Sequence, residues 1–282
     1  MDEVLTRDFI KEIMKSDLGY GDITTNSLIN ENMVVEAKVS TKEEGIFAGA
    51  KIAKVILELF DLHPLYIRQD GEQIGRGDTL LAFIGQAQSI LNCERTLLNF
   101  LMRMSGIATL TSLALNIARK LNNSIRIAST RKTTPGFSYF EKKAVEIGGG
   151  DTHRFRLDDL ILIKDNHIAL VGDVEQAVRL AKQKTSFSKK IEVEITTPAD
   201  IVKIVEAGAD IVMLDNMSVS EVKQAIELLI KKGFRKNVIL EVSGGITLEN
   251  LDEYAETGVD IISMGVLTHS YTSLNMSLEV IS

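Results

Sequence analysis

Residues 190–215 read KIEVEITTPADIVKIVEAGADIVMLD and contain two strand-like stretches, 190–196 and 210–215, with a helix-like stretch between them. Both stretches are rich in Ile and Val, which is typical of strands that are buried on both faces of a sheet. Thr197 followed by Pro198 is a typical start for the intervening helix. The order strand, helix, strand predicts a parallel sheet covered by helices.

The same alternation continues through the second part of the chain, from about residue 105 onward. Its later strands recur about every 20 to 28 residues, which is the spacing of β/α units in a (β/α) barrel or a doubly wound sheet. The first hundred residues differ, because short strands and glycine turns surround a helix at 50–60 and indicate an α+β module. The strand-like stretches of the second part are 125–129, 160–164, 190–196, 210–215, 238–245 and 260–265, and its helix-like stretches include 198–207, 218–232 and 247–256.

Composition restricts the class of protein. The chain has 282 residues, of which 45% are hydrophobic, enough to build one large or two modest cores. Its net charge of -7 argues against a nucleic-acid surface, and we expect no apolar run long enough to span a membrane. The single cysteine, Cys93, has no partner for a disulfide and is expected to be a small core residue. These features predict a cytoplasmic protein.

A cluster of basic residues interrupts this acidic sequence. Between Arg126 and Arg156 there are seven Lys and Arg residues against three Asp and Glu residues, an excess of +4. A cationic patch in an acidic protein favours a pocket for a small and highly charged anion.

Charged residues also stand at or near the carboxyl ends of the predicted strands. Lys164, Glu194, Asp215 and Glu241 each occupy such a position. In a barrel these strand ends open on one face, where active sites are built, and buried charges there need partners or ligands. Glycines follow the last two strands, where barrels commonly bind phosphate because glycines let backbone N–H groups approach its oxygens. A tight turn alone would also explain either group of glycines, and more often does. The phosphate-site candidates are Ser243, Gly244, Gly245 and Gly265.

Several short motifs together closely resemble the quinolinate phosphoribosyltransferases, also called nicotinate-nucleotide pyrophosphorylases (carboxylating). Each motif is short, and the specificity of the resemblance comes from their number and their spread over nearly the whole chain. The main matching stretches are Ser129-Thr130-Arg131-Lys132-Thr133-Thr134-Pro135-Gly136, Glu141-Lys142, Gly148-Gly149-Gly150, His153-Arg154, Lys164-Asp165-Asn166-His167, Glu192-Val193-Glu194, Met213-Leu214-Asp215-Asn216 and Ser243-Gly244-Gly245-Ile246.

The resemblance implies a fold and a reaction. The fold would be an N-terminal α/β sandwich (1–104), an open (β/α) barrel with a parallel sheet (105–270) and a C-terminal segment (271–282) that packs on the N-terminal domain. The reaction would transfer the phosphoribosyl group of phosphoribosyl pyrophosphate to quinolinate with loss of a carboxylate. Nicotinate mononucleotide, CO2 and pyrophosphate would result, for NAD biosynthesis. The family forms dimers whose active sites are completed by the neighbouring subunit.

The family pattern also implies a role for each candidate residue. Quinolinate is a dianion, and arginines bind carboxylates bidentately where lysines provide a point charge. Glu194 and Asp215 would bind the ribose and hold Mg2+ near the diphosphate, because carboxylates are the side chains that Mg2+ prefers. The expected catalytic residues are Lys132, Lys164, Glu194 and Asp215. Those expected to bind quinolinate are Arg131, His153 and Arg154 with Arg95 from the partner subunit, while Lys132, Lys164, Ser243, Gly244, Gly245 and Gly265 line the diphosphate region.

This chain departs from the family pattern at a few positions. Ser129 stands where an aspartate is common, and Ser138 stands where an arginine is common. Asp151 and Thr152 precede His153 where an asparagine is more usual. The principal cations are retained, so we expect these changes to affect the support around the site.

Two other functions fit parts of the sequence. A (β/α)-barrel lyase would use Lys164 as a Schiff-base residue, but it leaves the other cations and the Glu194 and Asp215 pair without a role. A protein that binds a pyridine dicarboxylate without catalysis would need no Mg2+. Trapping by borohydride and Mg2+-dependent product formation distinguish these alternatives from phosphoribosyl transfer.

Overall fold

The protein is described by a computed structural model that covers residues 3–281. Within that range the chain divides into two compact units. Unit 1 comprises the residues up to 110, residues 139–149 and the residues from 271 on, and unit 2 comprises residues 111–138 and 150–270. The division falls inside one long helix, α4 (Ala87–Leu121), and it groups residues 139–149 with unit 1, whereas the sequence assigns them to the barrel domain.

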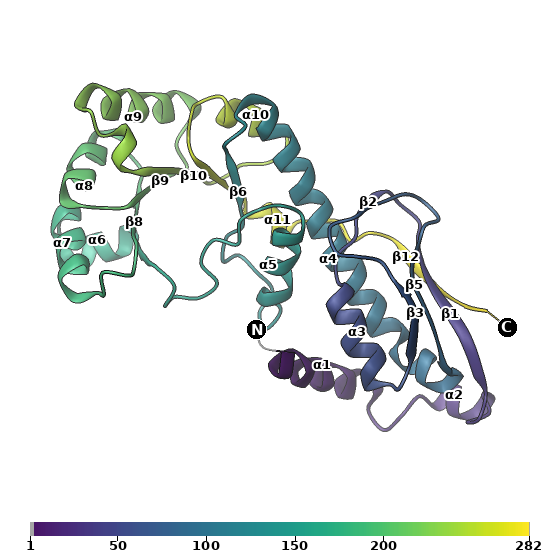
Figure 1. Cartoon of the computed structure of the whole chain (residues 1–282). Helices are drawn as coiled ribbons and strands as arrows, with labels where there is room; N and C mark the ends of the chain where they lie inside the picture. Colours follow the sequence, from purple (N-terminus) through teal and green to yellow (C-terminus); the bar gives the residue numbers. More distant parts are fainter. Residues whose placement is uncertain (1–2, 282) are drawn as a thin grey trace. The chain divides into compact units, whose positions relative to one another are not determined.

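Unit 1 is built around an antiparallel sheet of order β12-β1-β5-β3, which Figure 1 shows beside α3. Strand β12 comes from the far end of the sequence and pairs with β1 from Glu36 opposite Ile281 to Thr41 opposite Met276. The remaining strands, β2 and β4, form a small separate sheet. The elements are α1 (Glu3–Leu18), α2 (Ile23–Leu28), β1 (Val34–Thr41), β2 (Gly45–Ile46), α3 (Ala50–Leu59), β3 (His63–Ile67), β4 (Gln73–Ile74), β5 (Thr79–Gln86), α4, α5 (Ser138–Ile147) and β12 (Met276–Ile281).

Unit 2 is a parallel sheet of six strands in the order β6-β11-β10-β9-β8-β7. Strands alternate with helices along the chain (Figure 1), and no pairing joins β6 to β7 in residues 3–281, so the barrel is open. This confirms the predicted open (β/α) barrel and its parallel sheet. The elements are β6 (Arg126–Ala128), β7 (Ile161–Ile163), α6 (Asp165–Val171), α7 (Val174–Lys184), β8 (Ile191–Ile195), α8 (Ile201–Ala207), β9 (Ile211–Asp215), α9 (Val219–Lys232), β10 (Ile239–Ser243), α10 (Leu251–Ala255), β11 (Ile261–Ser263) and α11 (Val266–His269), with short 3-10 turns at Pro198–Asp200 and Arg235–Asn237.

One predicted helix is shorter than its pattern suggests. The sequence predicts a helix over 247–256, but α10 begins only at Leu251, with Asn250 at the N-cap. The Thr247 N–H donates to Asn250 Oδ1 at 2.9 Å, and the Thr247 hydroxyl accepts the Glu249 N–H at 3.3 Å. These side-chain bonds stabilise a turn before the helix, because Thr and Asn side chains compete with the helical backbone for its hydrogen bonds.

Helix α4 corrects the expectation that no stretch is long and apolar enough for a membrane span. By length and composition it passes that test, with a mean hydropathy of 1.3 over its best window. However, 56% of that window is buried inside the protein. Core helices of globular proteins pass the same test, so the signal for a membrane span is weak.

A glycine on α4 allows the C-terminal segment of unit 1 to lie directly against the helix. A Cβ atom added to Gly106 would stand 2.1 Å from the backbone oxygen of Thr272 and 3.0 Å from Ser273 Cα. Nearby, the Leu274 N–H donates to the Met102 carbonyl at 3.0 Å. The close contact of these two backbones leads the chain into β12.

We therefore expect Gly106→Ala to destabilise the protein, because the new methyl group would overlap with backbone atoms that cannot rotate away. The expected loss is about 3 kcal/mol of unfolding free energy, measured by denaturant unfolding. Gly75→Ala is the matched control, since a Cβ atom at Gly75 meets nothing within 4 Å and its φ is not positive. Equal stability of the two variants would contradict the proposed contact.

Candidate active site

A cavity of about 460 Å3 opens at the carboxyl ends of the strands of unit 2. It brings together ten of the twelve candidate residues from the sequence, although they are spread over more than a hundred positions. The ten are Arg131, Lys132, His153, Arg154, Lys164, Glu194, Asp215, Ser243, Gly244 and Gly245, and the lining also includes Ser129, Thr130, Leu162, Met213, Asn216, Glu241 and Ser263.

Strand register explains why these side chains meet. Glu194 pairs with Met213 on β9, and Met213 pairs in turn with Glu241 on β10. One step further along, Asp215 pairs with Ser243, which pairs with Ser263 on β11. Side chains two residues apart on a strand share a face, so these strands present successive layers of polar residues to the cavity.

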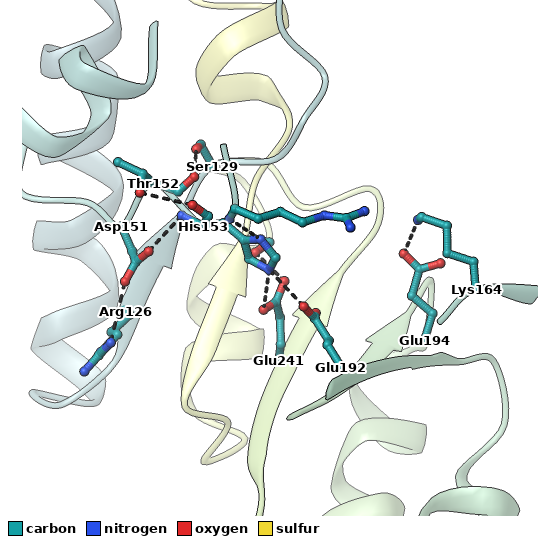
Figure 2. A network of polar contacts seen from close by, with 11 residues as sticks. Arg126, Ser129, Asp151, Thr152, His153, Lys164, Glu192, Glu194 and Glu241 are labelled. Atoms are coloured by element: carbon teal, nitrogen blue, oxygen red, sulfur yellow. Dashed lines mark hydrogen bonds and ion pairs between the residues drawn. The ribbon is translucent and has the colours of Figure 1, made fainter. Parts of the chain in front are cut away.

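Lys164 and Glu194 form an ion pair at the mouth of this cavity. The Lys164 ammonium donates to Glu194 Oε1, and the Glu194 side chain is only 15% exposed (Figure 2). Lys164 directly follows β7, and its backbone N–H donates to His167 Nδ1 at 3.0 Å. His167 thus fixes the turn that starts α6 and serves a structural role in positioning Lys164.

Asp215 ends β9 and is oriented by the residue that follows it. Asn216 donates its side-chain amide to Asp215 Oδ2 at 2.8 Å and its backbone N–H to the Ser243 carbonyl at 2.9 Å. Asn216 has a φ of 55°, a conformation that Asn tolerates better than most residues. A Cβ atom at Gly244 would lie 2.2 Å from Asn216 Oδ1, so only glycine fits beside this amide.

Arg131 and Arg154 supply cations that no carboxylate of the protein neutralises at hydrogen-bond distance. Arg154 is 7% exposed, and in residues 3–281 neither guanidinium donates a hydrogen bond to a protein acceptor. Burial and then the nearby Arg131 charge lower the pKa of Arg154. An arginine remains protonated nonetheless, so the buried donors of Arg154 and the exposed donors of Arg131 are available to an anionic ligand.

His153 lies over two fully buried carboxylates. Its Nε2 is 3.3 Å from Glu192 Oε2 and 3.3 Å from Glu241 Oε2, and both glutamates are 0% exposed (Figure 2). Glu241 Oε1 also accepts the Ser263 hydroxyl at 2.5 Å. The ligand atoms of His153, Glu192 and Glu241 lie within 4.8 Å of one another, close enough to surround a metal ion. This grouping differs from the Glu194 and Asp215 pair that the sequence assigns to Mg2+.

Two opposed effects determine the protonation state of His153 and its two neighbouring glutamates. Burial lowers the pKa of His153, but the hydrogen bonds to Glu192 and Glu241 outweigh burial and raise that pKa to about 10. A doubly protonated ring conflicts, however, with the 2.7 Å hydrogen bond in which Nδ1 accepts the Arg154 backbone N–H. That bond needs the Nδ1 lone pair, so the ring proton lies on Nε2. The further proton then lies on the acid pair, because burial raises the pKa of Glu192.

Three departures from the family pattern form one local network beside His153. The Ser129 hydroxyl donates to the Thr152 carbonyl at 2.9 Å, and the Ser129 N–H donates to the Asp151 carbonyl at 2.9 Å. Asp151 Oδ1 accepts the His153 N–H at 2.8 Å, and its carboxylate lies 3.5 Å from the Arg126 guanidinium (Figure 2). The changes therefore support one another and the segment that leads into the site.

Two candidate residues do not line the cavity. Arg95 is exposed on α4 in unit 1, and its predicted role involves a partner subunit. Gly265 lies beneath Lys132, since a Cβ atom there would stand 3.1 Å from Lys132 Cδ and 2.9 Å from His269 Nε2. Thr268, three residues on, donates its hydroxyl to the Lys132 carbonyl at 2.8 Å. Gly265 thus makes room for Lys132.

Cys93 plays no part in this site. It is 0% exposed on α4, and burial raises the pKa of its thiol to about 12. The thiolate is the reactive form of cysteine, so a thiol held neutral by burial is a core residue, as the sequence predicts.

Comparison with known families settles the kind of protein to which this site belongs. Residues 22–105 match the family described as "Quinolinate phosphoribosyl transferase, N-terminal domain", and residues 107–279 match the corresponding C-terminal domain. The chain belongs to the quinolinate phosphoribosyltransferase family. This confirms the resemblance drawn from the short motifs.

The similar proteins match this chain over nearly its whole length and over nearly their own. A probable nicotinate-nucleotide pyrophosphorylase [carboxylating] of Methanothermobacter thermautotrophicus is 50% identical over 97% of this chain and 98% of its own. The crystal structure of NadC from Streptococcus pyogenes has a TM-score of 0.91 at 36% identity and covers 100% of this chain and 99% of that one. The nicotinate-nucleotide pyrophosphorylase of Francisella tularensis has a TM-score of 0.92 at 34% identity, with 100% and 98% covered.

The sequence predicts no role for three residues that shape this quinolinate phosphoribosyltransferase site, namely Glu192, Asn216 and Ser263. It places Glu241 at a strand end but does not include it among the site residues. Glu192 stands two positions before Glu194, and this spacing places both on one face of a strand. Glu241 on β10 is level with Glu194 in the strand register, since both pair with Met213. The contact of both acids with His153 depends on the path of residues 151–154, which no local pattern indicates.

We expect Asn216→Gly to separate stability from function. Glycine adopts a φ of 55° without strain, so the thermal unfolding temperature should not fall. Loss of the amide that orients Asp215 should lower kcat/KM for phosphoribosyl pyrophosphate by about tenfold, as for a hydrogen bond to a charged group. Asp61→Gly is the matched control, because Asp61 has a φ of 54° in unit 1. A similar loss of activity in both variants would refute the role of the amide.

Proposed function

We propose that the protein transfers the phosphoribosyl group of phosphoribosyl pyrophosphate to the ring nitrogen of quinolinate, with decarboxylation, in NAD biosynthesis. The observation that carries the proposal is the pair of guanidinium groups of Arg131 and Arg154. They share a cavity with the carboxylates Glu194 and Asp215, and no acceptor among the described residues binds either group. Such a cavity suits one ligand with two carboxylates and another with a diphosphate. The relatives that match over nearly the whole chain carry the name nicotinate-nucleotide pyrophosphorylase [carboxylating].

Binding of quinolinate is assigned to the arginines. Each guanidinium offers parallel N–H donors that match a carboxylate, and at the buried Arg154 these bonds are strengthened because water competes less. Arg154 is the more buried of the two and holds the ligand in one orientation. Positioning the ring nitrogen against the ribose carbon is itself a large part of catalysis, since it replaces a bimolecular encounter.

The diphosphate is assigned to Lys132, Lys164 and the turn at Gly244 and Gly245. Both glycines have positive φ values, 96° and 63°, which let backbone groups lie close to a ligand. Gly265 makes room for the Lys132 side chain. When the ribose C1–O bond breaks, its electron pair leaves with pyrophosphate, and these cations stabilise the departing charge.

Mg2+ is proposed to bind with the diphosphate beside Glu194 and Asp215. Their carboxylates fit this role: the Asp215 carboxylate accepts the Asn216 side-chain amide, and Glu194 pairs with Lys164. When bound, the ion would neutralise diphosphate oxygens and make pyrophosphate a better leaving group. The same two carboxylates can accept hydrogen bonds from ribose hydroxyls and stabilise positive charge that develops on the sugar.

Decarboxylation needs no further catalytic base. Once C1 of the ribose is bonded to the ring nitrogen, that nitrogen carries a positive charge. The C–C bond to the adjacent carboxylate then breaks, CO2 leaves, and the electron pair remains on the ring carbon, where the cationic nitrogen stabilises it until a solvent proton is added. The arginines and lysines act by position and charge, so this function requires no nucleophile in the protein.

The alternatives from the sequence fit the site less well. A Schiff-base lyase needs a free lysine amine in the cavity, whereas Lys164 is paired with Glu194. A binding protein for a pyridine dicarboxylate would leave Glu194, Asp215 and the glycine turn without a ligand. We also propose a homodimer in the cytoplasm in which Arg95 of one copy reaches the quinolinate site of the other.

The direct test is incubation with quinolinate, phosphoribosyl pyrophosphate and Mg2+, with detection of nicotinate mononucleotide, CO2 and pyrophosphate in equal amounts. Removal of the metal with EDTA should stop product formation, and added Mg2+ should restore it. Nicotinate should be a poor substrate, because it lacks the second carboxylate that the arginines bind. An imine trapped by borohydride at Lys164 would instead support the lyase.

Replacement of Arg131 or Lys164 by Met should lower kcat/KM by two orders of magnitude or more, since each change removes a charge that binds or stabilises a polyanion. Thermal unfolding should change little, as both side chains reach the cavity rather than the core. Arg179→Met on α7 is the matched control, because Arg179 is 65% exposed and pairs only with Glu175 in the described residues. Near-normal turnover of either site variant would refute these roles.

A further inference from the structure

Two buried acids, Glu192 and Glu241, have no role in the reaction proposed above. Both are 0% exposed, and they come from strands β8 and β10, which flank β9. A carboxylate without water is costly unless it is hydrogen-bonded or paired. Within residues 3–281, no group meets hydrogen-bond geometry with either oxygen of Glu192 or with Oε2 of Glu241, and only His153 Nε2, at 3.3 Å from one oxygen of each acid, is close enough to pair with them. Their contact with His153 is therefore the feature that needs an explanation.

The His153 ring connects these acids to the backbone of the substrate site. Its Nε2–H lies between the two carboxylates, and its Nδ1 accepts the backbone N–H of Arg154 at 2.7 Å. Both ring nitrogens are thus engaged inside the protein. His153, which also lines the cavity, therefore supports the backbone of Arg154.

The backbone at this point adopts a conformation that needs such support. His153 has a φ of 49°, which L residues with large side chains rarely adopt. Asp151 Oδ1 accepts the His153 backbone N–H at 2.8 Å, and the His153 imidazole accepts the backbone N–H of Arg154. Glu192 and Glu241 in turn contact the imidazole. The backbone N–H groups of His153 and Arg154 are therefore both bound by side chains.

We propose that Glu192 and Glu241 are positioning residues that act through His153 to present the Arg154 guanidinium to the carboxylates of the pyridine substrate. The inference rests on the proposed function, since it assigns residues that prepare the quinolinate site. It explains why a strained backbone and two buried acids adjoin an arginine whose guanidinium has no acceptor within residues 3–281.

A metal ion in the same place fits the hydrogen bonds less well. A metal-bound Nε2 must have its lone pair free, which places the ring proton on Nδ1. Nδ1 instead accepts the Arg154 N–H. The neighbouring positive charges of Arg154 and Arg131 also disfavour a cation at this point.

The test is a double-mutant cycle on the full-length protein. Glu241→Leu removes the acceptor for Nε2–H, Arg154→Lys removes the guanidinium, and the double variant combines them. The quinolinate Kd from titration calorimetry and the separate KM values for both substrates are measured. Glu241→Leu should raise the quinolinate Kd by about 10- to 100-fold, with KM for phosphoribosyl pyrophosphate changed by less than about twofold. The double variant should bind no more weakly than Arg154→Lys, because the acid acts through the arginine.

Conservative variants keep the test decisive if Glu241→Leu does not fold. Glu241→Gln retains an acceptor for Nε2–H and can direct its NH2 group to the Ser263 hydroxyl, so it should recover most of the affinity. Glu192→Gln should give a smaller loss that also disappears in the Arg154→Lys background. Glu227→Gln, on the exposed face of α9, is the control for removal of a negative charge and should leave both substrates unaffected.

A second readout does not depend on activity. In 15N-labelled protein, with His153 signals assigned by their loss in His153→Asn, the ring should show a proton on Nε2 and none on Nδ1. A proton on Nδ1, additive losses in the cycle, equal losses for both substrates, or stoichiometric binding of Zn2+ or Mn2+ that requires Glu192 and Glu241 would each overturn the inference. If wild-type protein binds no quinolinate while the Nε2–H tautomer is present, the proposed function fails instead.

Discussion

The parallel register of β7 to β11 is the constraint on which the site depends. Because the strands run in the same direction, their carboxyl ends meet at one edge, and residues two apart on each strand face the same cavity. Glu194, Asp215 and Ser243 reach one volume for this reason, although the sequence separates them widely. A slip of one residue in β8 would exchange Glu194 for the buried Val193 and remove the acid from the site.

Charged side chains of unit 2 form two groups that differ in their partners and in their burial. Two of those that face the cavity are left unpaired in the part of the chain that the structure describes: neither the Arg131 nor the Arg154 guanidinium has an acceptor there. The deeper acids, Glu192 and Glu241, are desolvated and depend on His153. Unpaired guanidinium groups stabilise the fold less than paired ones would, but they can bind a ligand. Polar groups without protein partners therefore often mark functional sites.

Much of this arrangement could be predicted from the sequence, and the reasons for success and failure differ by residue. Strands β8 and β9 followed from Ile and Val content, and the cations of the site from charge clustering and family motifs. Helix α7 was missed although Asp173 caps it by accepting the Gln176 N–H at 2.8 Å, a signal that the sequence carries. Strand β12 and the His153 contacts could not be predicted, because pairing with β1 and the path of residues 151–154 depend on parts of the chain that are distant in sequence.

The pairing of β12 with β1 has a consequence for biosynthesis. Strand β1 leaves the ribosome early, but its partner on one side, β12, follows it by more than 200 residues. Every strand and helix of unit 2 is synthesised in the interval between them. During translation the barrel can therefore form while the first sheet still has an open edge, and that edge is exposed to unwanted association until β12 has been synthesised.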